Sequence, residues 1–426
     1  MKILHISTSD LGGAGVATIR FHEALLKENI NSSILFLECS KYRGPNSYVF
    51  QKKARNEIKL PSYPTLTFKN YLLEKFFQKF TKDREFILIE LNKRKQADNK
   101  IEIDSQTKFE VFSSPTSFYN ILESDVYQNA DIIHLHWVSG FIDFESFFKN
   151  NRKPVFWSLH DEYPLLGAFH FKLDSERNKI EYGQIDQAYA KIKQDSILNS
   201  ASTITFVSGA DWLMIELSNH VFSTLNRVKV NYSVDKTLYR YIDKNSAKSL
   251  LNLPNDKPTI LFAAGNVLNY RKGFDLLLPL IEDYDFSDVH FMVMGDFKNK
   301  IENTNVTLLG KISDELLMPI IYAAADFYVL PSRAEGFSYG MSEALCCGTP
   351  VIAFDVADHK SFLVSNNLGV VADNVSVESL KKVVLNAVLG KYNFNNKLIA
   401  KKSIEFLDSS KTAKKLISIY NITLQI

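Results

Sequence analysis

The chain has 426 residues, which predicts two or three domains at roughly 150 residues each. Lysine and arginine number 50 against 48 acidic residues, so the formal net charge of +2 does not indicate a nucleic-acid partner. Three cysteines, Cys39, Cys346 and Cys347, exclude a disulfide framework and fit no zinc spacing. The N-terminus turns polar too early for a signal peptide, and no run of about 18 apolar residues appears, so we expect a cytoplasmic protein.

The first half of the chain alternates apolar strands with amphipathic helices. Residues 2–6 favour a strand, and a glycine loop with Gly12 and Gly13 precedes an amphipathic helix. Residues 68–86 are aromatic and basic and predict a helix. Further predicted strands lie at 32–38, 131–138, 153–160 and 203–208.

The second half repeats this alternation. Its predicted strands lie at 258–265, 289–296, 306–310, 326–332 and 349–355. Apolar strands that alternate with helices favour parallel sheets covered on both faces, so we expect an α/β protein with two doubly wound domains. We predict an N-terminal domain over 1–235, a C-terminal domain over 236–405 and a last helix within 406–426.

The segment 331–350, PSRAEGFSYGMSEALCCGTP, predicts an anion site. Ser338 is a candidate N-cap for a helix from about Tyr339 to Cys347, and Gly348 suits the position after it. The N-terminus of such a helix directs free N–H groups at whatever lies beyond the sheet, and phosphate is a natural ligand there.

Two glutamates flank this predicted phosphate site. Glu335 lies on the loop, Gly336 lets backbone approach closely, and Glu343 lies in the first turns of the helix. A carboxylate accepts two hydroxyl donors, so the pair suits a diphosphate with hydroxyls on both sides, as in a nucleotide-sugar. The alternative is a helix carboxylate plus a solvated glutamate, and the residues alone leave both interpretations open.

The same segment resembles the signature of family 4 retaining glycosyltransferases. That family has the GT-B fold, in which two Rossmann-like domains face each other across a central cleft. The resemblance implies that Glu335 contacts the donor sugar and that Glu343 holds the ribose. It also implies that backbone N–H groups near Gly336 meet the diphosphate, at Phe337, Ser338 and Tyr339.

Two further segments extend the resemblance. GNVLNYRKGFDLL matches the family's basic segment, in which Lys272 corresponds to a lysine that binds the diphosphate and Arg271 precedes it. A frequent family arginine is Asn266 here, and whether Arg271 replaces it stays open. The alternative for the basic pair is a solvated helix start. The loop with Gly12 and Gly13 matches the family's N-terminal glycine loop, near the diphosphate and the acceptor.

The histidines support two interpretations. His134 and His136 alternate on one predicted strand, so both face one way, and His160 and Asp161 follow the next strand. Together they predict a metal-dependent hydrolase as one alternative. By the resemblance, His160 instead matches a histidine at the donor sugar. We place His134, His136 and Asp161 on the acceptor side, with His134 and His136 lining the cleft or packing internally. His170 is left open.

The resemblance implies transfer of a sugar, with retention, from a UDP- or GDP-sugar to a hydroxyl of a saccharide or lipid-linked saccharide, in glycan or surface polysaccharide biosynthesis. His160, Glu335 and Lys272 would be catalytic, the nucleotide-sugar a co-substrate, and no metal or cofactor is expected. The last helix would return to the N-terminal domain. Residues 68–86 either contact the inner face of a membrane or an acceptor, or pack internally. A non-catalytic nucleotide-sugar-binding protein is the other alternative.

Overall fold

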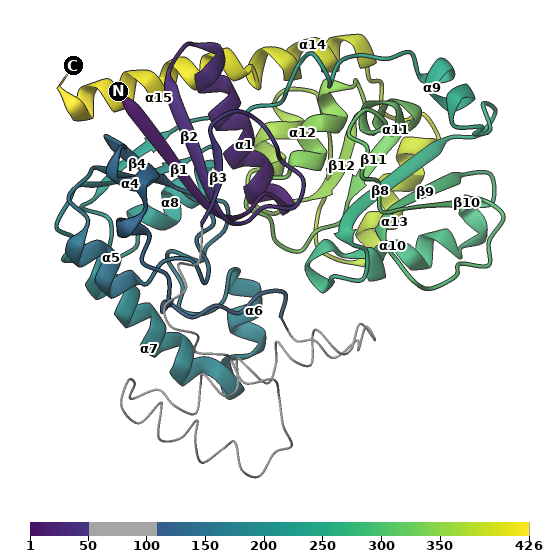
Figure 1. Cartoon of the computed structure of the whole chain (residues 1–426). Helices are drawn as coiled ribbons and strands as arrows, with labels where there is room; N and C mark the ends of the chain where they lie inside the picture. The colour runs from purple at the N-terminus through teal and green to yellow at the C-terminus, as the bar shows by residue number, and fades with distance from the viewer. Residues whose placement is uncertain (51–108, 426) are drawn as a thin grey trace, which may run out of the picture.

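The computed structural model describes residues 1–50 and 109–425, and these form two parallel β-sheets surrounded by helices (Figure 1). The first sheet has the order β3-β2-β1-β4-β5-β6-β7, with every neighbouring pair parallel. Its strands are β1 (Lys2–Ser9), β2 (Asn31–Glu38), β3 (Ser47–Val49), β4 (Ile132–Leu135), β5 (Val155–Ser158), β6 (Ile204–Ser208) and β7 (Asn226–Lys229).

The second sheet has the order β10-β9-β8-β11-β12-β13 and is also parallel. Its strands are β8 (Thr259–Asn266), β9 (His290–Asp296), β10 (Val306–Gly310), β11 (Phe327–Leu330), β12 (Val351–Phe354) and β13 (Gly369–Ala372). Below, each sheet with its helices is called the N-terminal or the C-terminal domain.

The helices connect successive strands. Those of the N-terminal domain are α1 (Gly12–Lys27), α4 (Asp125–Gln128), α5 (Phe144–Asn150), α6 (Lys172–Arg177), α7 (Lys179–Leu198) and α8 (Asp211–Ser218), with the 3₁₀ turn η1 (Ile121–Glu123). The others are α9 (Lys244–Leu250), α10 (Phe274–Ile281), α11 (Met318–Ala324), α12 (Tyr339–Cys346), α13 (Val377–Val388), α14 (Asn396–Phe406) and α15 (Ser409–Leu424), with the short turns η2 (Tyr270–Lys272), η3 (Tyr284–Phe286) and η4 (Lys360–Val364).

Both sheets confirm the predicted doubly wound α/β architecture. In each sheet the chain first builds outward in one direction and then in the other, so β1 and β8 each lie beside a switch in strand order. Alternate residues of β1 face opposite cores: Leu4 and Ile6 belong to one cluster and Ile3 to another. The edge strands β3 and β7 were not predicted, because both are largely exposed and lack a continuous apolar run; the short apolar strand β13 was also missed.

The last helix, α15, lies along the N-terminal domain, beside α1 (Figure 1, yellow). Its Leu416 and Tyr420 are fully buried in the core that contains Phe21 of α1. Before α15 in the chain, α9 packs on α11 and α14 packs on α12, and all four helices belong to the C-terminal domain. These contacts support our proposed division of the chain at about residues 235 and 405.

None of the helices in residues 1–50 and 109–425 combines the length and the apolar character needed to cross a membrane. The basic aromatic stretch at 68–86 lies outside the described residues. Its contact with a membrane or an acceptor therefore stays a prediction.

Candidate functional site

The loop after β11 leads into α12 at the carboxyl edge of the second sheet. Ser338 is the N-cap, as predicted: its Oγ accepts a hydrogen bond from the backbone N–H of Met341 at 3.3 Å. The helix ends at Cys346, and Gly348 follows with φ +93°. The first turn of α12 therefore directs its free N–H groups beyond the sheet edge, the usual ligand position in such sheets.

Glu335 is the centre of a buried charge cluster on this loop. Its Oε1 accepts hydrogen bonds from Lys272 Nζ at 2.6 Å and from the hydroxyl of Ser332 at 2.7 Å, and its Oε2 lies 3.3 Å from Arg271 Nη1. The basic pair lies just after β8, which neighbours β11, so adjacent strand ends assemble the cluster. Arg271 is only 7% exposed, which contradicts the alternative of a solvated helix start.

The charges of this cluster oppose the effect of burial. Burial alone would raise the pKa of Glu335, but the ammonium of Lys272 and the guanidinium of Arg271 outweigh it and lower the pKa to about 2. Burial and the neighbouring Arg271 lower the pKa of Lys272 from its usual value, while Glu335 opposes that shift. Glu335 is therefore an ionised acceptor at neutral pH and a weak base.

Arg271 also reaches a carboxylate in the N-terminal domain. Its Nε and Nη2 donate to the two carboxylate oxygens of Glu110 at 2.5 and 3.2 Å, and its guanidinium lies 4.2 Å from the ring centroid of Phe171. Its Nη1 donates to the carbonyl oxygen of Ala334 at 2.9 Å. The side chain of Asn266 instead bonds locally: its Oδ1 accepts a hydrogen bond from the backbone N–H of Leu268 at 3.0 Å. No motif had marked Glu110 as part of this site.

Glu343 lies on α12 and is only 7% exposed. Its Oε1 accepts a hydrogen bond from Arg20 Nη2 at 2.5 Å, and its Oε2 accepts one from the hydroxyl of Tyr322 at 3.0 Å. Arg20 belongs to α1 and lies over the ring of Tyr339, 4.6 Å from its centroid. The sequence reasoning missed Arg20, because a lone arginine on an amphipathic helix gives no signal of a partner in another domain. The alternative of a helix carboxylate plus a solvated glutamate is wrong, because Glu335 on the loop is only 5% exposed.

The two glycine segments approach each other from opposite domains. Gly12 and Gly13, predicted to form a loop, are the first residues of α1, and a Cβ added to Gly13 would lie 4.0 Å from the Tyr339 ring at the start of α12. Gly12 has φ +73°, which favours glycine. A Cβ at Gly336 would lie 1.9 Å from the carbonyl oxygen of His160, so any side chain at 336 would force these two loops apart.

Aromatic side chains fill the space beside this contact. The ring of Tyr232, in the N-terminal domain, has its centroid 4.6 Å from that of Phe337 and 5.9 Å from that of Tyr339. His160 meets the same Tyr232 ring at 5.6 Å. Tyr232 therefore joins residues that the sequence had assigned to one site, although no motif marked it.

His134 and His136 face the same way, as predicted from their alternation, with ring centroids 4.5 Å apart. His134 is fully buried: its Nδ1 lies 2.5 Å from the hydroxyl of Tyr420 on α15, and its Nε2 lies 2.8 Å from Ser158 Oγ. Burial, followed by the neighbouring His160, lowers the pKa of His134 to about 3. These contacts place His134 in packing between the sheet and the last helix.

The metal cluster expected under the hydrolase alternative is not assembled as predicted. Asp161 turns to His170, with Oδ2 and Nδ1 2.6 Å apart. The nearest metal-like group in the described part of the chain is instead His5, His134 and His136, whose ligand atoms lie within 4.8 Å of one another. His5 was not singled out from the sequence, because a histidine within an apolar strand gave no spacing signal.

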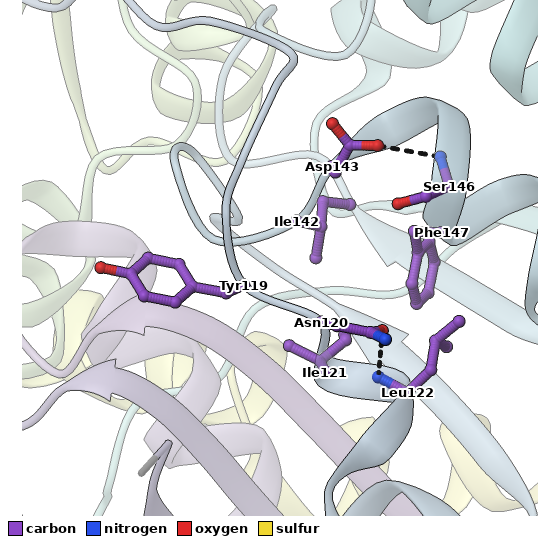
Figure 2. Close-up of a pocket in the computed structure, with 8 residues that line it drawn as sticks. All are labelled: Tyr119, Asn120, Ile121, Leu122, Ile142, Asp143, Ser146 and Phe147. Carbon is purple, nitrogen blue, oxygen red and sulfur yellow. Dashed lines mark hydrogen bonds between the residues drawn. The ribbon is translucent and has the colours of Figure 1, made fainter. Parts of the chain in front are cut away.

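A small cavity lies elsewhere in the N-terminal domain (Figure 2). Its volume is about 10 Å³, which is room for about one water molecule. Two of its lining residues serve as caps: Asp143 accepts from the N–H of Ser146 at 2.9 Å, and Asn120 accepts from that of Leu122 at 3.3 Å. None of the candidate site residues lines this cavity, so it is separate from the candidate site.

Comparison with known sequences finds a family match in the C-terminal domain and relatives that cover more of the chain. The family model described as "Glycosyl transferases group 1" matches residues 257–388. An uncharacterised 41.2 kDa protein in the cps region of Klebsiella pneumoniae is 27% identical over 288 residues, 66% of this chain and 75% of that protein. A glycogen synthase of Pseudothermotoga lettingae is 24% identical over 53% of this chain and 56% of its own length. The chain thus spans about half of that synthase.

Solved structures share the fold over the whole chain. Sucrose-phosphate synthase from Thermosynechococcus elongatus superposes with a TM-score of 0.66 at 15% identity, covering 100% of both chains. Anabaena Alr3699/HepE, in complex with UDP and glucose, has a TM-score of 0.63 at 14% identity and covers 99% of both. These structural matches confirm the predicted GT-B fold.

Proposed function

We propose that this chain, which carries a group 1 glycosyltransferase domain within a GT-B fold, transfers a sugar from a nucleotide-sugar to an acceptor hydroxyl with retention of configuration and without a metal ion. The observation that carries the proposal is the cluster of Lys272, Glu335 and the N-terminus of α12 at adjacent strand ends. A cation, a carboxylate and free backbone N–H groups at one edge suit a sugar diphosphate.

The chemistry would rest on electrostatic stabilisation. When the bond between sugar and diphosphate breaks, negative charge grows on the departing phosphate oxygens. Lys272 donates only to Glu335 among the described residues, so two of its three N–H donors can serve those oxygens. Donors in a buried site that aim at a developing charge commonly contribute the largest part of catalysis.

Arg271 supports the site more than it contacts the ligand. It donates to Glu110, to Glu335 and to the carbonyl oxygen of Ala334, which occupies most of its N–H groups. We therefore propose that Arg271 fixes Glu335 in place and does not substitute for the arginine missing at Asn266.

The state of Glu335 bears on how configuration would be retained. A carboxylate with a pKa of about 2 and hydrogen bonds from Lys272 and Ser332 is a poor base and a poor nucleophile. We therefore propose a same-face transfer, in which Glu335 accepts hydrogen bonds from sugar hydroxyls and the leaving phosphate takes the acceptor proton. His160, which adjoins Gly336, would orient the sugar.

Glu343 is the proposed ribose contact. Its carboxylate already accepts from Arg20 and Tyr322, and two oxygens provide about four acceptor positions, so ribose hydroxyls can bind beside both. Gly12 and Gly13 would border the acceptor, since Gly13 faces Tyr339. His136 and Asp161 are buried, so we propose that they support the acceptor side without contacting the acceptor themselves.

A donor screen tests the proposal. Anabaena Alr3699/HepE has been crystallised with UDP-glucose, and starch synthase IV from Arabidopsis thaliana with ADP. Thermal shift and slow hydrolysis with UDP-, ADP- and GDP-sugars should single out one donor. Donor binding without hydrolysis or transfer to any acceptor would favour a non-catalytic nucleotide-sugar-binding protein, and no binding at all would refute the proposal.

The proposal for the acceptor rests on where a relative of this chain is encoded. The Klebsiella pneumoniae relative lies in a cps region, which supports a saccharide or lipid-linked saccharide acceptor in surface polysaccharide synthesis. A cytoplasmic location and contact with the inner face of a membrane through residues 68–86 stay predictions from the sequence. Transfer from the identified donor to a panel of such acceptors, with the anomeric product read by NMR, tests both acceptor and retention.

A further inference from the structure

Three histidines on neighbouring strands form a hydrogen-bonded row. His5 lies in β1, His136 follows β4 and His160 follows β5, and these strands are adjacent in the sheet. His5 Nδ1 lies 2.9 Å from His136 Nε2, and His136 Nδ1 lies 3.0 Å from His160 Nε2. The row therefore runs across the sheet and ends at the loop that meets Gly336 of the other domain.

Burial disfavours the charged form of all three imidazoles. Burial, with neighbouring histidines, holds the pKa values of His5 and His136 well below the usual range. Burial lowers the pKa of His160 to about 4, while Asp161 opposes that shift. A neutral imidazole carries one N–H, so the position of the proton on one ring decides its position on the next.

The protons can be arranged along the row in two ways, and the surroundings of His5, at the end of the row away from His160, distinguish them. If His5 donates from Nδ1, His136 donates from Nδ1 in turn, and His160 keeps its proton on Nδ1. In the reverse order, His160 donates from Nε2, and the last proton lies on Nε2 of His5. That nitrogen is buried and has no hydrogen-bond partner in the described residues. A buried N–H without an acceptor is rarer than a buried lone pair without a donor, so the first order is favoured.

We propose that His5 and His136 are positioning residues that hold His160 in the tautomer with its proton on Nδ1, so that it presents a hydrogen-bond donor to the site between the domains. Within residues 1–50 and 109–425, Nδ1 of His160 makes no hydrogen bond, and the residue is partly exposed. Its partner would be a hydroxyl oxygen of the donor sugar. That last step rests on the proposed function, whereas the tautomer does not.

The chain contains a reference for each tautomer. Nε2 of His22 lies 2.9 Å from the carbonyl oxygen of Pro45, which can only accept, so His22 carries its proton on Nε2. Nδ1 of His359 lies 3.1 Å from the carbonyl oxygen of Phe354, so His359 carries its proton on Nδ1. Two-bond ¹H–¹⁵N spectra of the full chain at pH 7.5, with ¹⁵N-labelled histidine, read these patterns directly.

In those spectra we expect His160, assigned by its loss in H160Q, to show the pattern of His359. The pattern of His22, or two protonated nitrogens, would overturn the proposal. Stoichiometric metal in the purified chain that shifts the signals of His5 and His136 would overturn it too, because coordination would replace the hydrogen-bonded row. None of these outcomes depends on whether the chain transfers sugar.

Two variants of His136 separate positioning from packing. In H136N, an amide N–H can still donate to Nε2 of His160, whereas H136L cannot donate. We expect His160 to keep the Nδ1 proton in H136N and to become a mixture of tautomers in H136L, with kcat about tenfold lower in H136L alone. Identical tautomers and equal kcat in the folded variants would contradict the role. If H136L does not fold, the wild-type spectrum and H136N still decide.

Discussion

Arg20 on α1 and Glu343 on α12 form a buried ion pair of 2.5 Å that joins the two domains. Arg20 also lies over the rings of Tyr339 and Tyr239, 4.6 and 5.4 Å from their centroids. The proposed ribose contact is therefore supported by a side chain from the opposite domain. Domain arrangement and donor binding should be coupled through this pair.

The first prediction concerns that pair. Arg20→Met should lower the free energy of unfolding by about 3 kcal/mol, because it leaves the carboxylate of Glu343 buried beside Tyr322 alone. Glu343→Gln should cost a similar amount, and the double variant should lose less than the sum. Urea denaturation of the four proteins measures this coupling, and strictly additive losses would show that the pair contributes nothing.

The second prediction concerns Lys272. Lys272→Ala should raise the activation barrier by about 3 kcal/mol, roughly a hundredfold in kcat, because a donor to the developing phosphate charge is lost. Glu335→Ala should chiefly lower kcat, with a smaller effect on nucleotide affinity. Steady-state kinetics with the identified donor, beside calorimetry with the free nucleotide, separates the two effects. Turnover like that of the wild type in both variants would refute their assignment.

The third prediction concerns Gly336. Gly336→Ala should reduce kcat/KM strongly, because its Cβ would lie 1.9 Å from the carbonyl oxygen of His160 and push the two loops apart. Gly183→Ala on α7 is the matched control, since its Cβ would meet only a Lys179 side-chain atom at 3.5 Å. The control should keep its activity and be slightly more stable. Equal activity of both variants would show that the close contact is unimportant.

The fourth prediction concerns acid. The pKa of His134 falls from an unfolded value of about 6.5 to about 3 in the folded chain, chiefly by burial, so the unfolded state takes up the proton first. The stability that depends on neutral His134 is fully present above pH 6.5 and is lost as the pH falls toward 3. At pH 5 the free energy of unfolding should be lower by about 2 kcal/mol through this residue. Denaturation at pH 7.5, 6 and 5 should show a loss of stability to which the other buried histidines also contribute, and H134Q should show a smaller loss. Equal losses would contradict it.

The fifth prediction concerns metal. If Lys272 and the N-terminus of α12 carry the phosphate charge, transfer should proceed at full rate in excess EDTA. The histidine group at His5, His134 and His136 makes this a sharp test, because it is the described group with suitable ligand geometry. Activity that EDTA abolishes and a divalent cation restores would overturn metal-independent transfer.

The segment 331–350 shows how far the sequence alone reached. Ser338 as N-cap and the end of α12 followed from capping rules, and the nearness of Glu335 to Lys272 was implied by the family resemblance. These features are local or tied to a motif. The alternation of apolar strands and amphipathic helices predicted two doubly wound domains, and the family resemblance added the GT-B fold.

The partners across the domains were not predictable. Arg20 and Glu110 carry no spacing signal, because their partners Glu343 and Arg271 are 323 and 161 residues away. His5 was missed for a similar reason: its neighbour His136 comes from another strand, 131 residues on. Pairing over such distances depends on the sheet order and the domain orientation, which a single sequence does not contain.

The hydroxyl of Tyr420 reaches His134, and Leu416 and Ala413 fill the core around Ile3 and Phe21. The first strand of the chain thus completes its core with residues that a ribosome makes some 400 residues later. During synthesis the N-terminal domain would have to wait, with an apolar face uncovered, until α15 emerges. Substitutions in α15 should therefore increase the chaperone dependence of the nascent chain before they lower the stability of the folded protein.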